Sequence, residues 1–217
     1  LATNYADAKK LWDAQRDLVQ ESLSKQGLQL LYAVPWPGQG FYTKKPINSL
    51  DDLKGVKFRT YNAATSNMAE LMGAVPTTVE AVEIPQAFST GVVDAMVTSG
   101  ATGQRTKAWD FSNHFYDLNA WMPKNMIFVN KSAFSKLNAD EQKALLEAAA
   151  KAETRGWQMS EDIASASTEA LKAAGMTVEA GSSALVDGLK GIGTTLTKQW
   201  LENAGDRGQS LMKAYQN

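Results

Sequence analysis

The chain has 217 residues, 44% of them hydrophobic and 21% charged, a composition typical of a globular protein with one large or two small domains. Its 22 basic and 23 acidic residues give a net charge of −1, which argues against nucleic acid or an anionic membrane surface as a partner. The absence of cysteine excludes disulfides, thiolate metal sites and a cysteine nucleophile, and no apolar run approaches the ~18 residues of a membrane span.

The N-terminal part of the chain predicts a capped helix followed by strands. Asn4 can cap the helix, whose larger apolar residues share one face, and Gly27 ends it. The run LQLLYAV after Gly27 is apolar almost throughout, as in strands that are covered on both faces. The expected elements are a helix at 4–26, strands at 28–34, 40–47 and 56–61, and a short helix capped by Ser49.

The middle of the chain alternates short helices with strands. This alternation favours an α/β fold with a parallel or mixed sheet, in which ligands bind beyond the carboxyl ends of the strands. Arg59, Thr98 and Ser99 lie at such ends. Because a strand arginine is costly to bury without a partner, Arg59 in this position suggests an anion site. The expected elements are helices at 65–74 and 84–91, and strands at 75–79, 92–98 and 118–130.

The C-terminal part predicts an unusually long helix from 140 to 174. Asn138 can cap it and Gly175 ends it, and 35 residues correspond to about 50 Å. Gly156 in its interior should cost only about 1 kcal/mol relative to alanine, so we expect no interruption. The elements that follow are a short strand at 176–180 and one or two helices at 183–214.

Three segments taken together resemble the periplasmic solute-binding proteins of TRAP transporters, the DctP-type family. These segments are PINSLDDLKGVKFRTYN (46–62), LMGAVPTTVEAVEIPQAFSTGVVDA (71–95) and LNADEQKALLEAAAKA (137–152). The resemblance implies a two-lobed, periplasmic-binding-protein-like α/β fold with mixed sheets, a long helix that braces both lobes, and an N-terminal part of the family chain that is missing here. The expected division is 1–60 for the rest of the first lobe, 61–130 for the second lobe with crossover strands, and 131–217 for the long and closing helices.

The resemblance implies a periplasmic receptor, monomeric and not membrane-inserted, that delivers a small organic acid to TRAP membrane subunits without a metal or cofactor. In the family, the arginine that ends the motif D-L-K-G-x-K-x-R forms a salt bridge with the ligand carboxylate, and here it is Arg59. A planar guanidinium can bind a carboxylate through two hydrogen bonds. The alternative for Arg59 is a surface ion pair with Asp51 or Asp52.

The chain departs from the family pattern at two further places. The segment PWPGQGFYTKKPI lacks the second arginine of many members, for which Lys44, Lys45 or Lys57 are possible substitutes. In VVDAMVTSG, Thr98 or Ser99 takes the place of the family's ligand-binding asparagine. One cation with aromatic walls suits a monocarboxylate, such as an aromatic or 2-oxo acid.

Four further residues are expected at the ligand: Trp36, Tyr61, Trp121 and Asn125. The tryptophans serve equally well as packing anchors, and Thr98 or Ser99 can cap the segment that follows them. Two other functions stay open, namely an enzyme on a related two-lobed fold and an interaction module built on the long helix. The only histidine, His114, suggests neither a catalytic triad nor a metal site.

Overall fold

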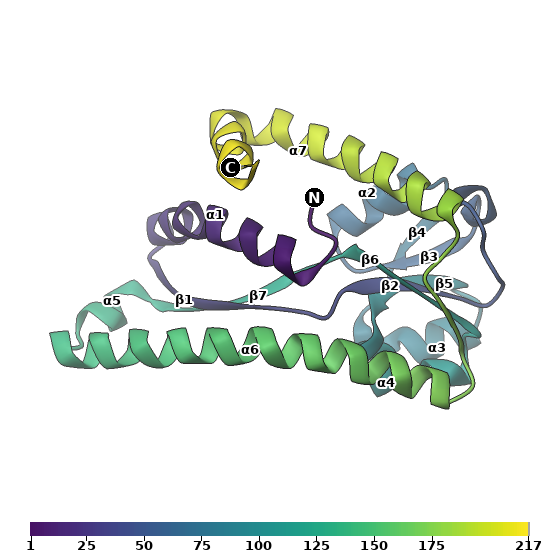
Figure 1. Ribbon diagram of the computed structural model, residues 1–217, viewed down its shortest axis with the longest axis horizontal. Helices are drawn as coiled ribbons and strands as arrows, with labels where there is room; N and C mark the ends of the chain where they lie inside the picture. The colour runs from purple at the N-terminus through teal and green to yellow at the C-terminus, as the bar shows by residue number, and fades with distance from the viewer. Residues whose placement is uncertain (217) are drawn as a thin grey trace.

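The computed structural model describes residues 1–216 and arranges its strands in two sheets (Figure 1). The strands are β1 (Leu28–Pro35), β2 (Gln39–Thr43), β3 (Lys57–Thr60), β4 (Val75–Thr78), β5 (Ala95–Ser99), β6 (His114–Trp121), β7 (Lys124–Asn130) and β8 (Thr177–Glu179). One sheet has six strands in the order β4-β3-β5-β2-β6-β8, and the other has two, β1 and β7. Because β3 is parallel to β4 and β5 while β2 is antiparallel to its neighbours, the larger sheet is mixed, as expected.

Three helices begin at the capping residues that the sequence indicates. Asn4 accepts a hydrogen bond from the backbone of Asp7, and Ser49 and Asn138 form capping boxes. Four short helical elements, at 81–83, 100–105, 108–110 and 131–135, were not predicted as helices. The helical elements are α1 (Tyr5–Lys25), η1 (Leu50–Leu53), α2 (Ala63–Leu71), η2 (Ala81–Glu83), α3 (Ile84–Ser89), α4 (Gly100–Arg105), η3 (Ala108–Asp110), α5 (Lys131–Ser135), α6 (Ala139–Ala173) and α7 (Ser183–Gln216). None of these helices combines the length and apolar character that a bilayer crossing needs.

The chain passes between the two sheets at two short crossovers, from β1 to β2 and from β6 to β7, and a third time from β7 to β8 through the long helix α6. The single strand region expected over 118–130 is two strands, since β6 belongs to the larger sheet and β7 to the smaller one. Pro123, which lacks an amide hydrogen, lies at the break. The expected boundaries at 60 and 130 do not coincide with the sheets, because β2 and β3 pair with β5 while β1 pairs with β7. The division of the chain into parts of two lobes and a helical segment at these boundaries stays a prediction.

Apolar side chains fill both faces of the six-stranded sheet. The cluster on one face includes Phe41, Phe58 and Leu185, and the cluster on the other includes Tyr42 and Met96. Consecutive residues of each strand point to opposite faces, so Phe58 anchors β3 on one side and Arg59 projects from the other. A third, smaller cluster surrounds the fully buried Trp12 between α1 and β1.

The long helix α6 runs without interruption past Gly156, which confirms the prediction. It packs on β1 at one end and on α4 and β8 at the other, so it reaches both sheets (Figure 1). A Cβ atom at Gly156 would lie 2.5 Å from Cγ2 of Val34, so glycine permits the close approach of helix and strand. In contrast, α7 is two helices that meet at a kink, where Gly205 has a φ of 57°.

Glu153 of α6 ties together three elements. Its carboxylate accepts hydrogen bonds from Nη1 of Arg16 at 2.6 Å and Nε1 of Trp12 at 3.3 Å, both on α1. It also accepts one from the backbone nitrogen of Ala33 on β1, at 2.8 Å. All three donors lose their partner if this carboxylate is removed.

Replacing Glu153 with alanine should therefore lower the free energy of unfolding by about 2–4 kcal/mol, since it leaves partly buried donors unpaired. Urea unfolding of the variant measures this loss. Glu147→Ala on the same helix is the matched control, because its 4.0 Å pair with Lys143 is exposed and should change stability by less than about 0.5 kcal/mol. Equal effects of the two substitutions would contradict the role of Glu153.

Candidate functional site

The neighbouring strands β3, β5 and β2 bring polar side chains to one edge of the six-stranded sheet. Arg59 is in register with Met96, and Thr98 lies two residues further along β5 on the same face. Gln39 begins β2 opposite Ser99, where β5 ends. The edge formed by the carboxyl ends of β3 and β5 is where ligands bind in α/β sheets.

Arg59 carries a buried charge that has no carboxylate partner. Its side chain is only 4% exposed, and its Nε donates to the carbonyl oxygen of Val79 at 2.9 Å. The guanidinium carbon lies 5.1 Å from the ring centre of Tyr61. Burial lowers the pKa of Arg59, whereas Tyr61 and Glu80 raise it, and a guanidinium stays protonated in proteins. Within residues 1–216 it forms no salt bridge, so its terminal nitrogens are available to an anion.

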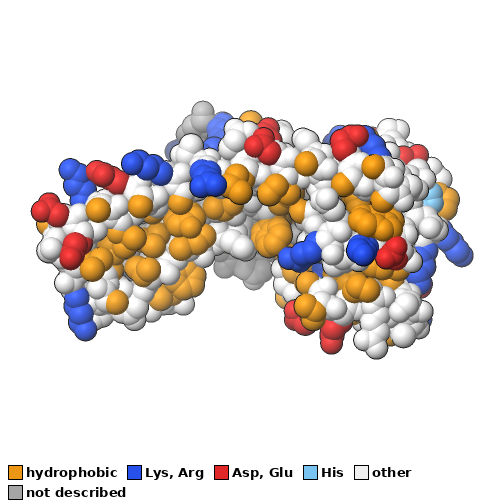
Figure 2. All heavy atoms as spheres, turned by 90° about the horizontal axis from the view of Figure 1, so that it is seen from below, with side chains coloured by type: hydrophobic (Ala, Val, Ile, Leu, Met, Phe, Trp, Pro, Cys, Tyr) orange, Lys and Arg blue, Asp and Glu red, His pale blue; other side chains and the backbone are white. Residues whose placement is uncertain are grey.

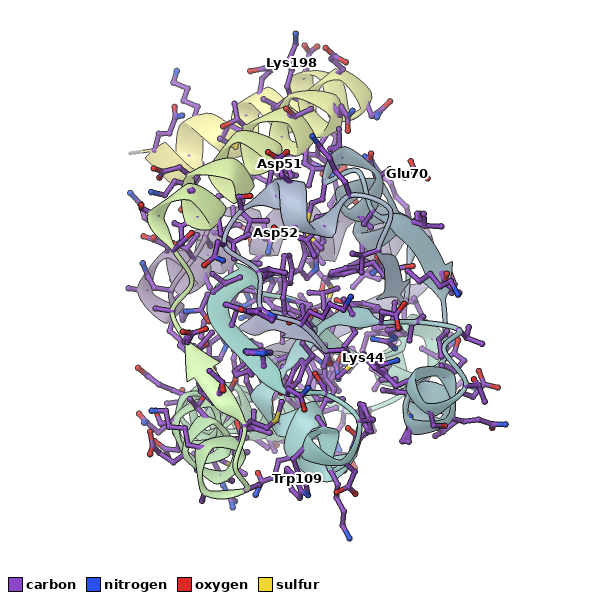
Figure 3. All side chains as sticks on the ribbon, turned by 90° about the vertical axis from the view of Figure 1, so that its right-hand side faces the viewer. Lys44, Asp51, Asp52, Glu70, Trp109 and Lys198 are labelled. Atoms are coloured by element: carbon purple, nitrogen blue, oxygen red, sulfur yellow. The ribbon has the colours of Figure 1, made fainter. Side chains whose placement is uncertain are left out.

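The alternative prediction, an ion pair of Arg59 with Asp51 or Asp52, is wrong. Asp51 pairs with Lys54 at 2.7 Å. Asp52 accepts hydrogen bonds from the backbone nitrogens of Asn48 and Ser49, which lower its pKa. Figure 3 shows both aspartates on η1, close to α7.

The predicted residue Tyr61 connects Arg59 to Gln39, which the sequence analysis missed. The Tyr61 hydroxyl donates to Oε1 of Gln39 at 2.9 Å. Burial raises the pKa of Tyr61 despite this bond and the nearby Arg59 charge, so the hydroxyl keeps its proton at neutral pH. Gln39 is 7% exposed, and within residues 1–216 its amide nitrogen has no hydrogen-bond partner. The glycines on both sides of Gln39 were the only sequence signal of a special position.

Thr98 and Ser99 are adjacent but differ in how their hydroxyls are used. Ser99 caps α4, since its Oγ accepts from the backbone of Thr102 at 3.2 Å and donates to the Thr102 hydroxyl at 3.3 Å. The capping alternative is therefore confirmed for Ser99. Thr98 faces Gly40 on the neighbouring strand, and its hydroxyl has no hydrogen bond within the part of the chain that the structure describes. Thr98 is the residue of the two with a free hydroxyl.

Trp36 and Asn125 contact each other at the crossovers. Nε1 of Trp36 donates to Oδ1 of Asn125 at 3.0 Å, and the backbone nitrogen of Trp36 donates to Pro123 at 2.9 Å. Both residues lie outside the six-stranded sheet, and no hydrogen bond among the described residues joins them to Arg59 or Thr98.

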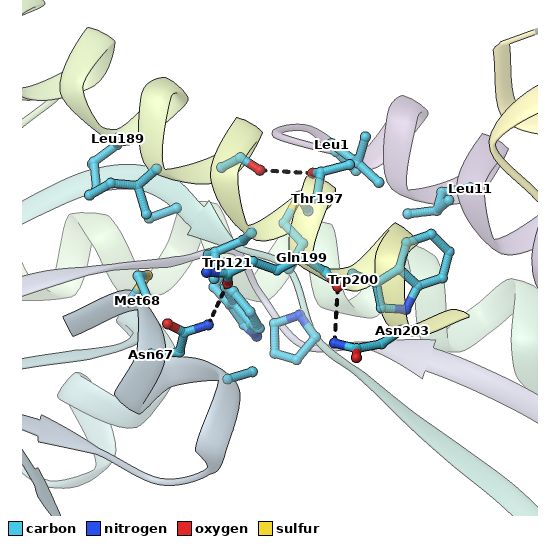
Figure 4. A pocket seen from close by; sticks show the side chains of 18 of the residues that line it. Leu1, Leu11, Asn67, Met68, Trp121, Leu189, Thr197, Gln199, Trp200 and Asn203 are labelled. Atoms are coloured by element: carbon cyan, nitrogen blue, oxygen red, sulfur yellow. Dashed lines mark hydrogen bonds between the residues drawn. The ribbon is translucent and has the colours of Figure 1, made fainter. Parts of the chain in front are cut away.

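Trp121 is the cross-strand neighbour of Gln39 and lines a cavity of 840 Å³ between α2 and α7 (Figure 4). Asn67 and Gln199 join these helices by a 2.8 Å hydrogen bond. The described lining includes neither Arg59 nor Thr98. The cavity therefore lies beside the polar edge, on the face of the sheet that α2 covers.

The three lysines considered as a second cation do not join Arg59. Nζ of Lys44 pairs with Asp94 at 2.9 Å, and Lys57 donates to the carbonyl oxygen of Gly91 at 2.9 Å. Lys45 is exposed on the loop that follows β2. Among these candidates, Arg59 is the buried cation, and within residues 1–216 it has no carboxylate partner.

Residues 1–190 match the bacterial extracellular solute-binding proteins, family 7 (DctP). The chain belongs to this family. It is similar in structure to DctP7, a Bordetella pertussis extracytoplasmic solute receptor binding pyroglutamic acid, with a TM-score of 0.97, 49% identity, and coverage of 100% of this chain and 72% of that one. It is also similar to a marine metagenome TRAP solute-binding protein specific for pyroglutamate, with a TM-score of 0.94 and 42% identity. That match covers 100% of this chain and 71% of the metagenome protein. These matches confirm the resemblance and the two-lobed α/β fold that it implies.

The chain is also related to the outer membrane transporter protein TsaT of Comamonas testosteroni. The two are 27% identical over 181 residues, which are 82% of this chain and 54% of TsaT. The chain thus spans about half the length of this relative.

The Ser99 cap can be tested independently of any ligand. Ser99→Ala should lower the free energy of unfolding by about 1 kcal/mol, because the first turn of α4 loses its acceptor. Thermal and urea unfolding measure the change. Ser165→Ala, on an exposed position of α6, should leave stability nearly unchanged, and an equal loss there would contradict a capping role.

Proposed function

We propose that this DctP family member is the ligand-binding part of an extracytoplasmic receptor that delivers a small carboxylic acid to the membrane subunits of a TRAP-type transporter. The observation that carries the proposal is Arg59, a buried guanidinium with one hydrogen bond and no carboxylate partner among the described residues. A ligand carboxylate bound through two hydrogen bonds supplies the missing charge. Family membership supports a receptor rather than the enzyme alternative. Its periplasmic location and monomeric state stay predictions.

The ligand we propose is pyroglutamate or a closely similar cyclic monocarboxylate. Two relatives at 49% and 42% identity are described as binding pyroglutamate. At this edge of the sheet, Arg59 is the buried cation without a carboxylate partner among the described residues, and it supports one ligand carboxylate, because a second carboxylate would leave water without a partner charge. The Thr98 hydroxyl, on the same face of the sheet as Arg59, can accept from the lactam N–H. Gln39 belongs to the opposite face, and its free amide nitrogen can donate to the lactam oxygen across the edge of the sheet, where Tyr61 joins it to Arg59. This assignment retains the predicted monocarboxylate and replaces the aromatic body with a small ring.

The roles of the other predicted contacts follow from their present partners. Tyr61 orients Gln39 and covers the guanidinium of Arg59. Ser99 caps α4 and directly follows Thr98 in β5, so it fixes the backbone beside Thr98. Contacts of the ligand with Trp36, Trp121 and Asn125 stay predictions, because no hydrogen bond among the described residues joins them to Arg59.

Arg59→Ala should weaken pyroglutamate binding by about 2–5 kcal/mol, since the ligand carboxylate then enters the site without its cation. Arg59→Lys should restore only part of the loss, because an ammonium cannot form the planar double contact. Calorimetry on the full-length protein measures both variants. Arg105→Ala, which removes an exposed arginine of α4, is the control. Unchanged affinity in Arg59→Ala would refute the proposed function.

Gln39→Met tests the lactam contact separately. It keeps the length of the side chain but removes the amide donor, so pyroglutamate affinity should fall about tenfold, or about 1.4 kcal/mol. Cyclopentanecarboxylate keeps the ring and the carboxylate but has no lactam, so its affinity should not change. A tenfold loss for both acids would show that Gln39 acts through the shape of the site, and no loss for either would remove Gln39 from it.

A further inference from the structure

The guanidinium of Arg59 is almost closed off from solvent. Arg59 projects from the face of the six-stranded sheet that α3 covers, and Figure 2, which views the molecule from that side, shows this half closely filled by side chains. Arg59 is 4% exposed. A ligand carboxylate needs the terminal nitrogens of the guanidinium for a double contact, so a neighbouring group has to move before the ligand can bind.

Two neighbours of the guanidinium differ in how freely they can move. One is the carbonyl oxygen of Val79, which accepts from Nε of Arg59 at 2.9 Å. The backbone nitrogen of Val79 donates to the carbonyl oxygen of Thr60 at 3.2 Å, so this segment continues the pairing of β3 with β4 and is held by the sheet. The other neighbour is the ring of Tyr61, whose centre lies 5.1 Å from the guanidinium carbon. Of the two, Tyr61 is the one that can move without a change in the sheet.

The backbone of Tyr61 is fixed, so its movement is limited to the side chain. Tyr61 directly follows β3, and its backbone nitrogen donates to Oγ1 of Thr65 at 3.2 Å. Thr65 and Asn62 form the capping box of α2, which holds this short connection. Tyr61 is half-buried, so its ring can turn toward solvent by rotation about its side-chain bonds. Exposed side chains change rotamer within nanoseconds, and a ring that stays over the guanidinium therefore needs an additional contact to hold it.

Gln39 supplies that contact. The Tyr61 hydroxyl donates to Oε1 of Gln39 at 2.9 Å, and we call this hydrogen bond the latch. Gln39 is 7% exposed and lies in β2, where it is paired with Ser99 on one side and with Trp121 on the other. The latch thus joins a side chain that can rotate to a residue that the sheet holds in place.

We propose that Tyr61 is a gate over Arg59, which opens when the latch to Gln39 breaks and closes again over the bound ligand. The proposal rests on the proposed function, because it takes Arg59 as the cation that binds the carboxylate. A guanidinium can stack its face on an aromatic ring while its edge binds a carboxylate, so the ring can return to its place once the ligand has entered. The gate then delays entry and exit by the same factor. It controls the rates of binding and leaves the affinity unchanged.

Stopped-flow fluorescence of the full-length protein tests the gate, with cyclopentanecarboxylate as the probe because it has no lactam for Gln39 to contact. Tyr61→Phe keeps the ring and removes the latch. We expect the association rate constant kon and the dissociation rate constant koff each to rise about fivefold, which corresponds to one hydrogen bond of about 1 kcal/mol, while Kd changes less than about twofold. Gln39→Met breaks the same latch from its other end and should raise both rates equally. For pyroglutamate, kon should rise by the same factor in both variants.

The matched control is Tyr5→Phe, which also removes a partly buried tyrosine hydroxyl with a 2.9 Å hydrogen bond, in this case to Ser160 on α6. It should leave both rates unchanged, and an equal rise there would overturn the proposal. A faster koff with unchanged kon in Tyr61→Phe would make Tyr61 a simple ligand contact, and unchanged rates in both latch variants would exclude the gate.

Failure of the gate and failure of the proposed function give different results. Full affinity in Arg59→Ala would refute the proposed function, whereas the gate fails on the rates alone while Arg59 stays essential for binding. Circular dichroism shows whether each variant is folded, and Gln39→Met tests the latch even if Tyr61→Phe does not fold.

Discussion

A positive charge held in a nearly buried position without a counter-charge is the constraint on which the rest of the site depends. Desolvating a guanidinium costs free energy that its hydrogen bond to Val79 and its contact with the Tyr61 ring offset only in part. The alternation of side chains along β3 keeps Arg59 in this position, because Phe58 is fixed in the core on the opposite face. The strand cannot turn Arg59 to solvent without exposing Phe58. The packing of the sheet thus offsets the rest of the desolvation cost, and the charge of Arg59 remains available for a ligand.

The same edge shows how neighbouring polar groups divide structural and binding roles. Ser99 is fully buried and uses its hydroxyl to begin α4, whereas the hydroxyl of Thr98 is left without a partner among the described residues. The Tyr61 hydroxyl donates a hydrogen bond to Oε1 of Gln39, and the amide nitrogen of that glutamine remains free among the described residues. Groups with internal partners fix the geometry, and the groups they orient are the ones that can recognise a ligand. Removing a group that has an internal hydrogen-bond partner should therefore lower the stability of the fold more than it lowers ligand affinity.

The sequence predicted those features that local chemistry determines and missed those that depend on strand register. Caps at Asn4, Ser49 and Asn138, and the uninterrupted α6, follow from residues within one or two turns of each other. Arg59 could be placed at the edge of the sheet because the sequence shows where its strand ends. Gln39 could not be assigned, because its importance arises from its contact with Tyr61, 22 residues away, and from its place opposite Ser99. The break between β6 and β7 was missed for a similar reason, since both segments have strand composition and only their partners differ.

The crossovers show why a site at the edge of one sheet is also held in place relative to the other. Pro35, Pro37 and Pro123 lie where the chain leaves one sheet for the other, and each proline ring fixes a backbone angle. The hydrogen bond from Trp36 to Pro123 holds the two crossovers side by side, and the Trp36 side chain adds a second bond to Asn125. Gln39 is the third residue after Trp36, and its cross-strand neighbour Trp121 ends β6 just before Pro123. The residues that flank the binding edge are therefore the same ones that connect the two sheets, whereas Arg59 lies on the interior strand β3.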